Sequence, residues 1–545
     1  MISEVDTNLK WIVLGTSKSG IILTSKGNKQ GVLPKGSYLT IDEQTNNSGK
    51  VINSTKFILR VEDSTQKETF SPSPLIVDMD LDPLLEDGLC KNAITAVRVK
   101  DYSKRTDGLV DVIRPSLIAR RSNQKEINEA LEVKDGPKIF PATIFESVNS
   151  KLLDDNQNEI YAKLPENIYW HQIQITGKTG SGKTVASKYL AQYFVENKIN
   201  ISDNVDDSIE GAVLAINVKD IDFLTMNQPS TFNNDIKKEW SLLGLEQKGL
   251  SNYNIYFNGS DDSKILYNQG VDKDFCTKIT IDIKELEPNA ILGVVQSLTE
   301  LQQQNLPDIF RYWQQVEAVN ESDYFSFINW FEKCIDEENY FNTLDITGRK
   351  NGKNLHPGTA SNILQKLQTA SKYFNTRDDN GIQHKSLNAD DILVPGKMSV
   401  INVSHDPEFG SIVLRDLLNR ILQNKRDGKS NVPVLIIIDE VHQFYKSSSS
   451  KDALGALDTI CRVGRSSKIG VIFSTQNEDD LPKGVSSVVN TKLYFKTDSI
   501  KKNNFGVSQR EIQSLKAGFG VGMIHGMPNL NVFKFPLSCS GVPKL

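Results

Sequence analysis

The sequence contains few of the residues that cross-link a fold or bind a structural metal. Its 545 residues include only five cysteines, an odd number scattered along the chain, and six dispersed histidines. No Cys-x-x-Cys pair and no histidine spacing typical of zinc ligands occurs. This pattern predicts neither disulfides nor a zinc site, and it is typical of the reduced thiols of a cytoplasmic protein.

Long apolar segments are also missing. No run of about 18 consecutive apolar residues occurs, which predicts that no segment spans a membrane. The first residues lack a basic stretch followed by an apolar one, so we expect no signal peptide.

Strong positive charge is absent as well. The formal net charge of −5 at pH 7 argues against a uniformly basic nucleic-acid-binding protein. It leaves room for a local basic surface, such as the lining of a channel through a ring. The hydrophobic fraction of 38% and the charged fraction of 24% are typical of a soluble globular protein, and the length predicts roughly three to four domains.

Residues 1–120 show the pattern of β structure. Short runs rich in β-branched and aromatic residues, such as residues 11–14, 20–24 and 57–61, alternate with turn signals. Strands this short and evenly spaced favour a small barrel or sandwich. We find no catalytic residues in this segment, so its expected role is assembly or partner docking. Residues 121–165 are expected to form a connector.

A glycine-rich loop at residues 177–184 matches the pattern G-x-x-x-x-G-K-[ST] in full. Strand-like alternation precedes it at residues 169–176, and residues 185–194 follow with apolar residues at helical spacing. Strand, glycine loop and helix in this order bind phosphate, so we expect ATP here; the alternative is a chance match in a glycine- and lysine-rich loop. The predicted nucleotide-binding residues are Gly177, Thr179, Gly180, Ser181, Gly182, Lys183 and Thr184.

Two of these residues, and two more from a second motif, carry the expected chemistry. Lys183 is expected to reach the β- and γ-phosphates, and the Thr184 hydroxyl to bind Mg²⁺. At residues 434–440 a fully apolar run, typical of a buried central strand, ends in Asp439 and Glu440. Asp439 is expected to hold the Mg²⁺ ion, and Glu440 to activate the attacking water. With the loop, this strand predicts ATP hydrolysis rather than nucleotide binding alone.

A long segment separates these two motifs. Residues 212–220 have the pattern of another strand with a polar end, and residues 225–390 that of a continued sheet plus a helical insertion. The insertion is rich in aromatic residues, which we expect to pack its core, while stacking on DNA bases is the alternative. These residues are Trp313, Tyr324, Phe325, Phe327, Trp330 and Phe331.

The C-terminal part completes the predicted core. Its next apolar run ends in Gln476, which could orient the attacking water, sense the γ-phosphate or only cap the strand. Arg465 precedes this run and could be a finger for a neighbouring subunit's ATP or form a surface ion pair. The predicted fold is α/β: a RecA-like P-loop ATPase core with a parallel sheet over residues 166–224 and 391–545, a mainly helical insertion over 225–390, and a small N-terminal β-barrel.

In combination these motifs resemble the HerA-type ATPases of the HerA/FtsK branch of P-loop motors. The loop at residues 176–184 is close to the form of that branch. Residues 439–442 resemble its acidic strand end, and residues 464–465 before 474–476 resemble its arginine and strand-end glutamine. The N-terminal β segment resembles the small barrel of the family. Residues 217–220 depart from the usual aspartate-proline-lysine-glycine at the second strand end.

The resemblance implies a homo-hexameric ring that binds ATP and Mg²⁺ between subunits, with Arg465 acting in trans. It implies double-stranded DNA in the central channel. It also implies an effector protein, a nuclease or an NADase, docked on the face of the N-terminal barrel in antiphage defence or DNA end processing.

Three functional hypotheses follow. The first is an ATP-driven DNA translocase or helicase that works with a partner nuclease. The second is an ATPase scaffold that assembles and gates an effector in bacterial immunity, with translocation secondary. The third is a nucleotide-dependent switch that turns over too slowly to be a motor. The sequence does not separate them, because the gene of the partner is not visible in it.

Overall fold

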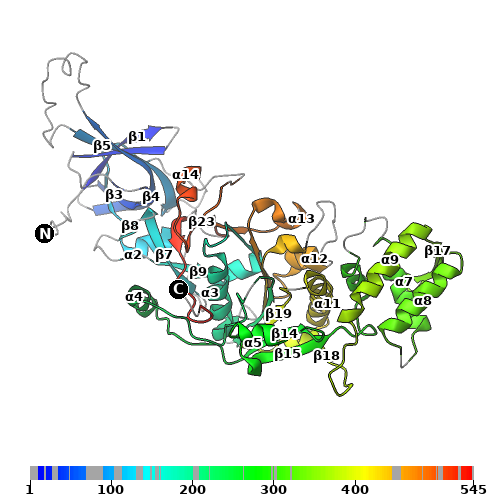
Figure 1. Ribbon diagram of the computed structural model, residues 1–545. Coiled ribbons are helices and arrows are strands. Elements are labelled where there is room, and N and C mark those ends of the chain that lie inside the picture. The colour runs from blue at the N-terminus through cyan, green and yellow to red at the C-terminus, as the bar shows by residue number, and fades with distance from the viewer. Residues whose placement is uncertain are drawn as a thin grey trace, which may run out of the picture. The chain divides into compact units, whose positions relative to one another are not determined.

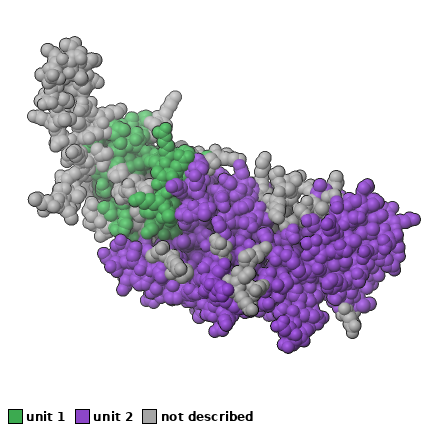
Figure 2. Space-filling model, viewed as in Figure 1, with its two compact units in different colours: residues 1–165, 500–535 green, residues 166–499, 536–545 purple. Residues whose placement is uncertain are grey.

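The structure is a computed structural model of the chain, and it forms two compact units, coloured green and purple in Figure 2. Unit 1 comprises Met1–Pro165 and Ile500–Phe535, and unit 2 comprises Glu166–Ser499 and Pro536–Leu545. The residues that the structure describes are 10–17, 20–26, 33, 35–47, 50–68, 90–102, 113–130, 139–147, 150–153, 159, 161–200, 208–219, 221–261, 263–295, 299, 303–319, 322–404, 406–444, 456–481, 483–498, 500, 507–525 and 530–542.

Unit 1 contains a closed antiparallel barrel with the strand order β1-β2-β5-β4-β3-β6 (Figure 1). Its strands are β1 (Trp11–Ser17), β2 (Gly20–Lys26), β3 (Tyr38–Asn47), β4 (Lys50–Glu68), β5 (Cys90–Asp101) and β6 (Ile118–Arg121). In β1, Trp11 and Val13 are buried while Ile12 and Leu14 are exposed, as the period of two in a strand requires. The small N-terminal barrel of the predicted fold is therefore confirmed.

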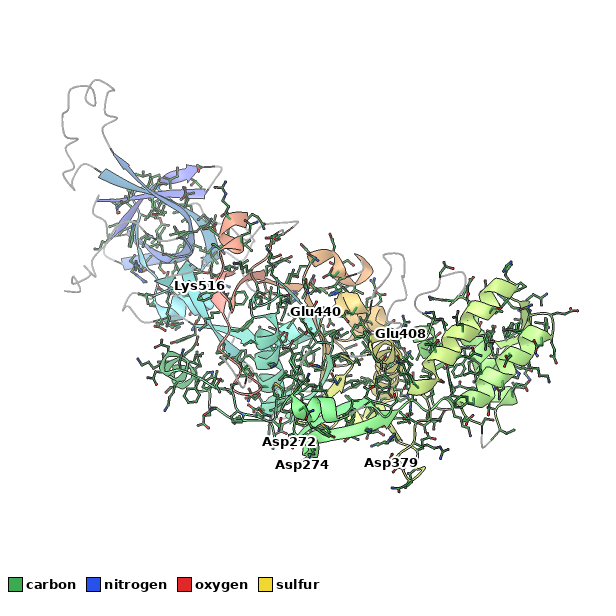
Figure 3. All side chains as sticks on the ribbon, in the orientation of Figure 1. Asp272, Asp274, Asp379, Glu408, Glu440 and Lys516 are labelled. Carbon is green, nitrogen blue, oxygen red and sulfur yellow. The ribbon has the colours of Figure 1, made fainter. Side chains whose placement is uncertain are left out.

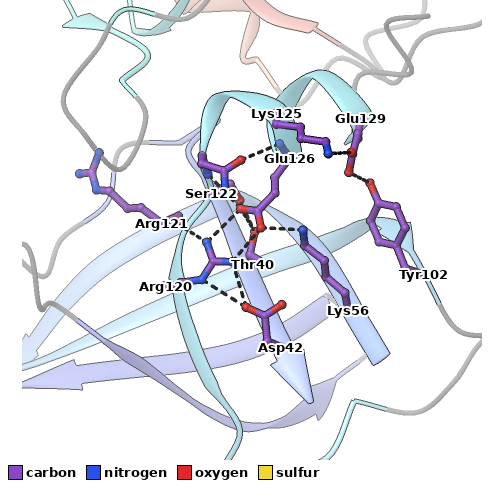
Figure 4. Close-up of polar contacts among 11 residues, drawn as sticks. Thr40, Asp42, Lys56, Tyr102, Arg120, Arg121, Ser122, Lys125, Glu126 and Glu129 are labelled. Atoms are coloured by element: carbon purple, nitrogen blue, oxygen red, sulfur yellow. Dashed lines mark hydrogen bonds and ion pairs between the residues drawn. The ribbon is translucent and has the colours of Figure 1, made fainter. Parts of the chain in front are cut away.

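A buried carboxylate ties the short helix α2 (Gln124–Ala130) to this barrel (Figure 4). The side chain of Glu126 is 3% exposed, lies 2.6 Å from Lys56 Nζ and accepts a hydrogen bond from Arg120 Nη1 at 2.9 Å. Glu126 and Asn123 also bond each other's backbone N–H through their side chains, which caps the start of the helix. Burial opposes ionisation of Glu126, but these donors outweigh it and lower its pKa to about 2.

Replacing Glu126 by glutamine should lower the free energy of unfolding of unit 1 by about 1–3 kcal/mol at pH 7. Lys56 and Arg120 are both partly exposed, so the loss is smaller than for a fully buried pair. The folded pKa lies below the ordinary glutamate value of 4.5, so this stabilisation is present above that pH and is lost as the pH falls toward 2. Thermal unfolding should therefore separate variant and wild type more at pH 7 than at pH 3, and an equal separation would contradict the assignment. Glu129→Gln, on the same helix but more exposed, is the control.

The rest of unit 1 contains further antiparallel strands, in which β7 pairs with β8, β9 and β24, and β24 pairs with β23. Its elements are β7 (Ile139–Ser147), β8 (Ser150–Lys151), β9 (Tyr161–Pro165), β23 (Phe519–Met523), β24 (Leu530–Lys534) and the short helix α14 (Gln509–Gln513). Residues 121–165 thus supply strands rather than only a connector. Residues 500–535 group with unit 1, whereas the sequence analysis placed them in the ATPase core. Antiparallel pairing between segments this far apart leaves no local signal in the sequence.

Unit 2 is built on a parallel sheet with the strand order β18-β15-β14-β19-β13-β20-β21-β10-β22. The strands are β10 (Ile173–Thr176), β13 (Ala212–Asn217), β14 (Tyr253–Asn258), β15 (Cys276–Thr280), β18 (Lys385–Ser386), β19 (Met398–Asn402), β20 (Val434–Ile438), β21 (Ile469–Thr475) and β22 (Thr491–Tyr494). Every residue of β13 and β20 is buried, because a parallel sheet is covered on both faces. The parallel sheet of the predicted core is therefore confirmed.

Helices pack on this sheet, among them α3 (Lys183–Glu196) on β13, β20 and β21, and α12 (Ala456–Val463) on β21 and on α11 (Pro407–Arg426). The remaining elements of this part are η2 (Glu166–His171), β11 (Lys198–Asn200), β12 (Ser208–Glu210), α4 (Asn234–Leu242), α5 (Ser263–Asn268), η3 (Lys273–Phe275), η4 (Pro288–Gly293), α10 (Ala389–Ile392), η7 (Val441–Gln443), η8 (Glu478–Asp480) and α13 (Lys483–Ser486). Among the described residues, no helix is long and apolar enough to cross a membrane.

The helical insertion lies between β15 and β18, so it is shorter than the predicted 225–390 (Figure 1). It consists of α7 (Leu306–Tyr312), η5 (Trp313–Glu317), α8 (Tyr324–Asp336), β16 (Tyr340–Leu344), β17 (Lys350–Asn354), α9 (Pro357–Thr369) and η6 (Ala370–Tyr373). Its core buries four of the aromatic residues named above, Trp313, Tyr324, Phe327 and Phe331. Core packing is confirmed for these four, whereas Phe325 is exposed and Trp330 is half-buried.

The cysteines whose side chains the structure describes are free thiols: Cys276, Cys334, Cys461 and Cys539. Burial raises the pKa of each of them above its ordinary value. At neutral pH these thiols are therefore protonated and poorly nucleophilic.

Candidate active site

Adjacent parallel strands bring the predicted site residues of unit 2 to one edge of its sheet. β21 lies between β10 and β20, and β20 lies between β21 and β13. The glycine loop follows β10, Gln476 follows β21, and Asp439 and Glu440 follow β20. The carboxyl ends of parallel strands share one edge, which is where open α/β sheets bind their ligands.

The backbone of the glycine loop takes a shape that most residues avoid. Gly180 and Gly182 have φ of 76° and 104°, in the left-handed region that favours glycine. The N–H of Gly177 donates to Thr475 O at 3.2 Å, which joins the start of the loop to the end of β21. The exposed Thr179 lies at the tip. The loop therefore curls directly above the strand ends.

The loop and the start of α3 offer unused hydrogen-bond donors to an anion. Gly182 precedes the helix without a side-chain cap, so the first N–H groups of α3 lack a capping partner. The hydroxyl of Ser181 is buried, and no described residue accepts or donates a hydrogen bond to it. Free N–H groups at a helix start and an unpartnered buried hydroxyl fit the phosphate oxygens of a nucleotide.

Lys183 supplies the cation of this site. Its side chain is buried, and Nζ donates to Gly177 O at 2.8 Å and to Lys178 O at 3.3 Å. Burial lowers the pKa of Lys183, while the nearby carboxylates of Glu440 and Asp439 oppose this shift. The ammonium is thus held beneath the loop, where it can exchange carbonyl contacts for phosphate oxygens.

Carboxylates gather on the other side of Lys183. Asp439 is 3% exposed, and burial raises its pKa to about 6, with repulsion from Asp222 and Glu440 adding to the effect. Thr184 Oγ1 donates to Asp222 Oδ2 at 3.5 Å. No group of three or more His, Cys, Asp or Glu side chains in the described part of the chain could hold a metal ion by itself. Hydroxyl and carboxylate oxygens suit Mg²⁺, which usually keeps water and phosphate oxygens as its other ligands.

Glu440 is held by Gln476, lies close to His442, and is constrained by its own backbone. It has φ 44° and ψ 50°, a conformation that costs a non-glycine residue about 1 kcal/mol or more. Gln476 Nε2 donates to both Glu440 carboxylate oxygens, at 3.2 and 3.1 Å, and His442 Nδ1 lies 3.3 Å from Oε2. Glu440 is one of the residues labelled in Figure 3. A carboxylate whose backbone position is fixed and whose oxygens accept hydrogen bonds from an amide is a suitable base for water activation.

Arg465 is not part of this cluster. It lies in the turn after α12, its side chain is exposed, and no hydrogen bond or ion pair joins that side chain to another described residue. Its neighbour Arg462 instead pairs with Asp458 at 2.9 Å. A surface ion pair, the alternative considered for Arg465, is therefore absent within the described residues.

Sequence reasoning missed two residues of this site. Asp222 lies in the loop after β13, two residues beyond the strand end at 217–220 whose pattern departs from the HerA-type motif, and Asp220 itself falls outside the described residues. His442 was noted only as part of a motif. An acidic residue shortly after a buried strand was the available signal for Asp222, but which acid faces the site depends on how the loop folds.

No protein-family model and no curated protein matches the sequence. Similar solved structures include the bacterial conjugative coupling protein TrwB, which is 12% identical with a TM-score of 0.47, covering 78% of this chain and 93% of that chain. VirB4 of Thermoanaerobacter pseudethanolicus is 12% identical with a TM-score of 0.40, covering 74% of this chain and 97% of that chain. TrwB has also been solved with ADP and Mg²⁺. The sheet order and the glycine loop of unit 2 are themselves those of a P-loop nucleotide-binding core.

Proposed function

We propose that this chain is an ATP-hydrolysing DNA translocase that acts as a homo-hexameric ring. The observation that carries the ATPase part is the meeting of the glycine loop, the buried Asp439 and the strained Glu440 at one sheet edge. Nucleotide binding alone needs a phosphate loop and a metal ligand. Hydrolysis also needs a base held in place, and Gln476 Nε2 donates hydrogen bonds to both carboxylate oxygens of Glu440.

Each residue of the site then has a role. The loop N–H groups and Lys183 bind the phosphates, and Thr184 and Asp439 hold Mg²⁺, which neutralises charge on the phosphate oxygens. Asp222 accepts the Thr184 hydroxyl bond and so aims the oxygen lone pairs of that hydroxyl at the metal position. Glu440 takes the proton of the attacking water.

Arg465 supports the ring. An exposed arginine without a partner among the described residues is available to a neighbouring subunit, where it would stabilise charge on the transferred phosphoryl group. The resemblance of residues 464–465 and 474–476 to HerA-type motors supports the same role. Each ATP would then bind between two subunits.

Mixing two inactive variants tests this role. Arg465→Ala chains keep an intact loop, and Lys183→Ala chains keep an intact arginine, so mixed rings contain some complete interfaces. We expect turnover to reappear on mixing, measured as phosphate release, although each variant alone is inactive. Arg462→Ala, whose arginine pairs within its own chain, is the control and should remain active. The absence of rescue at every mixing ratio would count against Arg465 acting across the interface.

The resemblance also supports double-stranded DNA as the track and an effector protein, a nuclease or an NADase, docked on the barrel of unit 1. ATP-dependent displacement of a third strand from duplex DNA by the wild type, and not by Lys183→Ala, would test translocation. The alternative is a scaffold that gates the effector in antiphage defence. Effector activation that survives the loss of DNA binding would favour that alternative.

A further inference from the structure

The insertion presents one strand almost entirely to solvent. β16 buries Phe341, Thr343 and Leu344, whereas all five residues of β17 are exposed. In the described part of the chain these two strands form a sheet of their own, in antiparallel register. One strand therefore anchors the hairpin and the other forms a free edge. Figure 1 shows β17 among the helices α7, α8 and α9.

The exposed strand is basic. Lys350 and Lys353 lie on β17, Arg349 directly precedes it, and residues 346–356 contain no acidic residue. None of these three side chains forms an ion pair with another residue that the structure describes. In a chain with a net charge of −5, an unpaired positive cluster of this kind stands out as a local anion-binding surface.

The acidic groups around the hairpin are engaged elsewhere. Asp345, in the turn, accepts hydrogen bonds from Thr347 Oγ1 at 2.6 Å and from the backbone N–H of Arg349 at 2.9 Å. Asp308 Oδ1 lies 2.6 Å from Arg311 Nη1. The carboxylate of Glu337 lies 3.7 Å from Lys333 Nζ. Cations thus balance the charges of Asp308 and Glu337, whereas the charge of Asp345 interacts with Arg349 and Glu317 hydrogen-bonds the side chain of Tyr312. No ion pair joins Lys350 or Lys353 to a carboxylate within the described residues.

Aromatic rings lie close to β17. Tyr340 is 49% exposed, and its ring covers Gly352 so closely that a Cβ there would lie 1.9 Å from the hydroxyl. Lys350 Nζ lies 6.0 Å from the centroid of the Tyr312 ring. Tyr312 in turn stacks on Trp330 at 6.3 Å with an interplanar angle of 27°. The hairpin therefore combines ammonium groups with ring faces.

We propose that a basic–aromatic face, made of Tyr312, Trp330, Tyr340 and Lys350, binds single-stranded DNA, with Lys353 on the other side of the same free edge strand. The two lysines neutralise phosphates, and the exposed ring of Tyr340 stacks on an unpaired base. A duplex hides the faces of its bases, so an exposed ring favours a single strand. The choice of DNA rests on the proposed function, whereas the position of the face does not.

Fluorescence anisotropy of the full chain with a labelled oligothymidine of about 20 nucleotides tests this proposal. Lys350→Glu combined with Lys353→Glu should weaken binding about tenfold or more and flatten its dependence on salt. Tyr340→Ala should weaken binding about fivefold or more. The matched controls are Lys237→Glu with Lys238→Glu, on the exposed face of α4, and the exposed Phe325→Ala. Both controls should bind as the wild type does. ATP turnover without DNA should be the same in all variants, which reports correct folding.

If the double lysine variant and Tyr340→Ala both bind oligothymidine as tightly as the wild type does, the proposal is overturned. The proposed function then remains intact. Tighter binding of the wild type to duplex DNA or to oligouridine than to oligothymidine would overturn the assignment to single-stranded DNA. Face-dependent oligothymidine binding supports the proposal even where ATP turnover does not respond to duplex DNA, a result that would remove the translocase function alone.

Discussion

Lys183→Ala is expected to abolish ATP hydrolysis, with a loss of at least about a hundredfold in turnover. Lys183 is the cation beneath the loop, and its Nζ already contacts two loop carbonyls at 2.8 and 3.3 Å. Without it, neither the bound phosphates nor the charge that develops during their transfer is balanced at this position. Phosphate release at saturating ATP measures the effect.

The same loop offers a matched control. Lys178 is exposed, and its Nζ lies 2.6 Å from Asp498 rather than beneath the loop. Lys178→Ala should therefore keep most of the activity. The Lys183 variant should also unfold at nearly the wild-type temperature, because burial already lowers the pKa of this lysine and its loss removes a desolvated charge. Near-normal turnover in Lys183→Ala would show that the glycine loop takes no part in ATP hydrolysis.

Glu440→Gln is expected to separate binding from hydrolysis. Glutamine keeps the size of the side chain but cannot take a proton from water, so turnover should fall by about a hundredfold to ten-thousandfold. The phosphate contacts come from the loop and Lys183, so ATP affinity should change little. Equilibrium binding of a fluorescent ATP analogue beside single-turnover hydrolysis measures both quantities.

A second carboxylate provides the comparison for Glu440. Glu478 follows the same strand end as Gln476, but its carboxylate lies 3.2 Å from Lys492 Nζ. Glu478→Gln should leave turnover within a few-fold of the wild type. If Glu440→Gln instead loses ATP binding, Glu440 shapes the loop after β20, as its left-handed backbone allows, and the base must be another group.

The site could be predicted wherever its signal is local. The loop 177–184 and the strand ending in Asp439 and Glu440 are continuous in the sequence, and each carries its own pattern of glycine, charge or apolar residues. The contact between Gln476 and Glu440 could not be predicted, because it depends on the order of the strands in the sheet. β21 separates β10 from β20, and this places Gln476 against Glu440.

Other features could not be predicted, because they depend on contacts with distant segments of the chain or with a second subunit. Asp222 reaches the site only because the loop after β13 folds so that its carboxylate lies beside the Thr184 hydroxyl. Residues 500–535 belong to unit 1 because β24 pairs with β7, a strand that lies hundreds of residues earlier in the sequence. Arg465 has no partner within the described chain, so its role depends on a second subunit.

The most direct test of an ATP-driven ring motor is the ATP turnover of the purified chain with and without double-stranded DNA, measured beside its mass in solution. We expect a particle of hexameric mass whose turnover rises when DNA is added. A hexamer whose turnover ignores DNA would contradict translocation and favour a scaffold that gates an effector. A chain that stays monomeric with ATP and DNA would contradict the ring and the role of Arg465 across its interface.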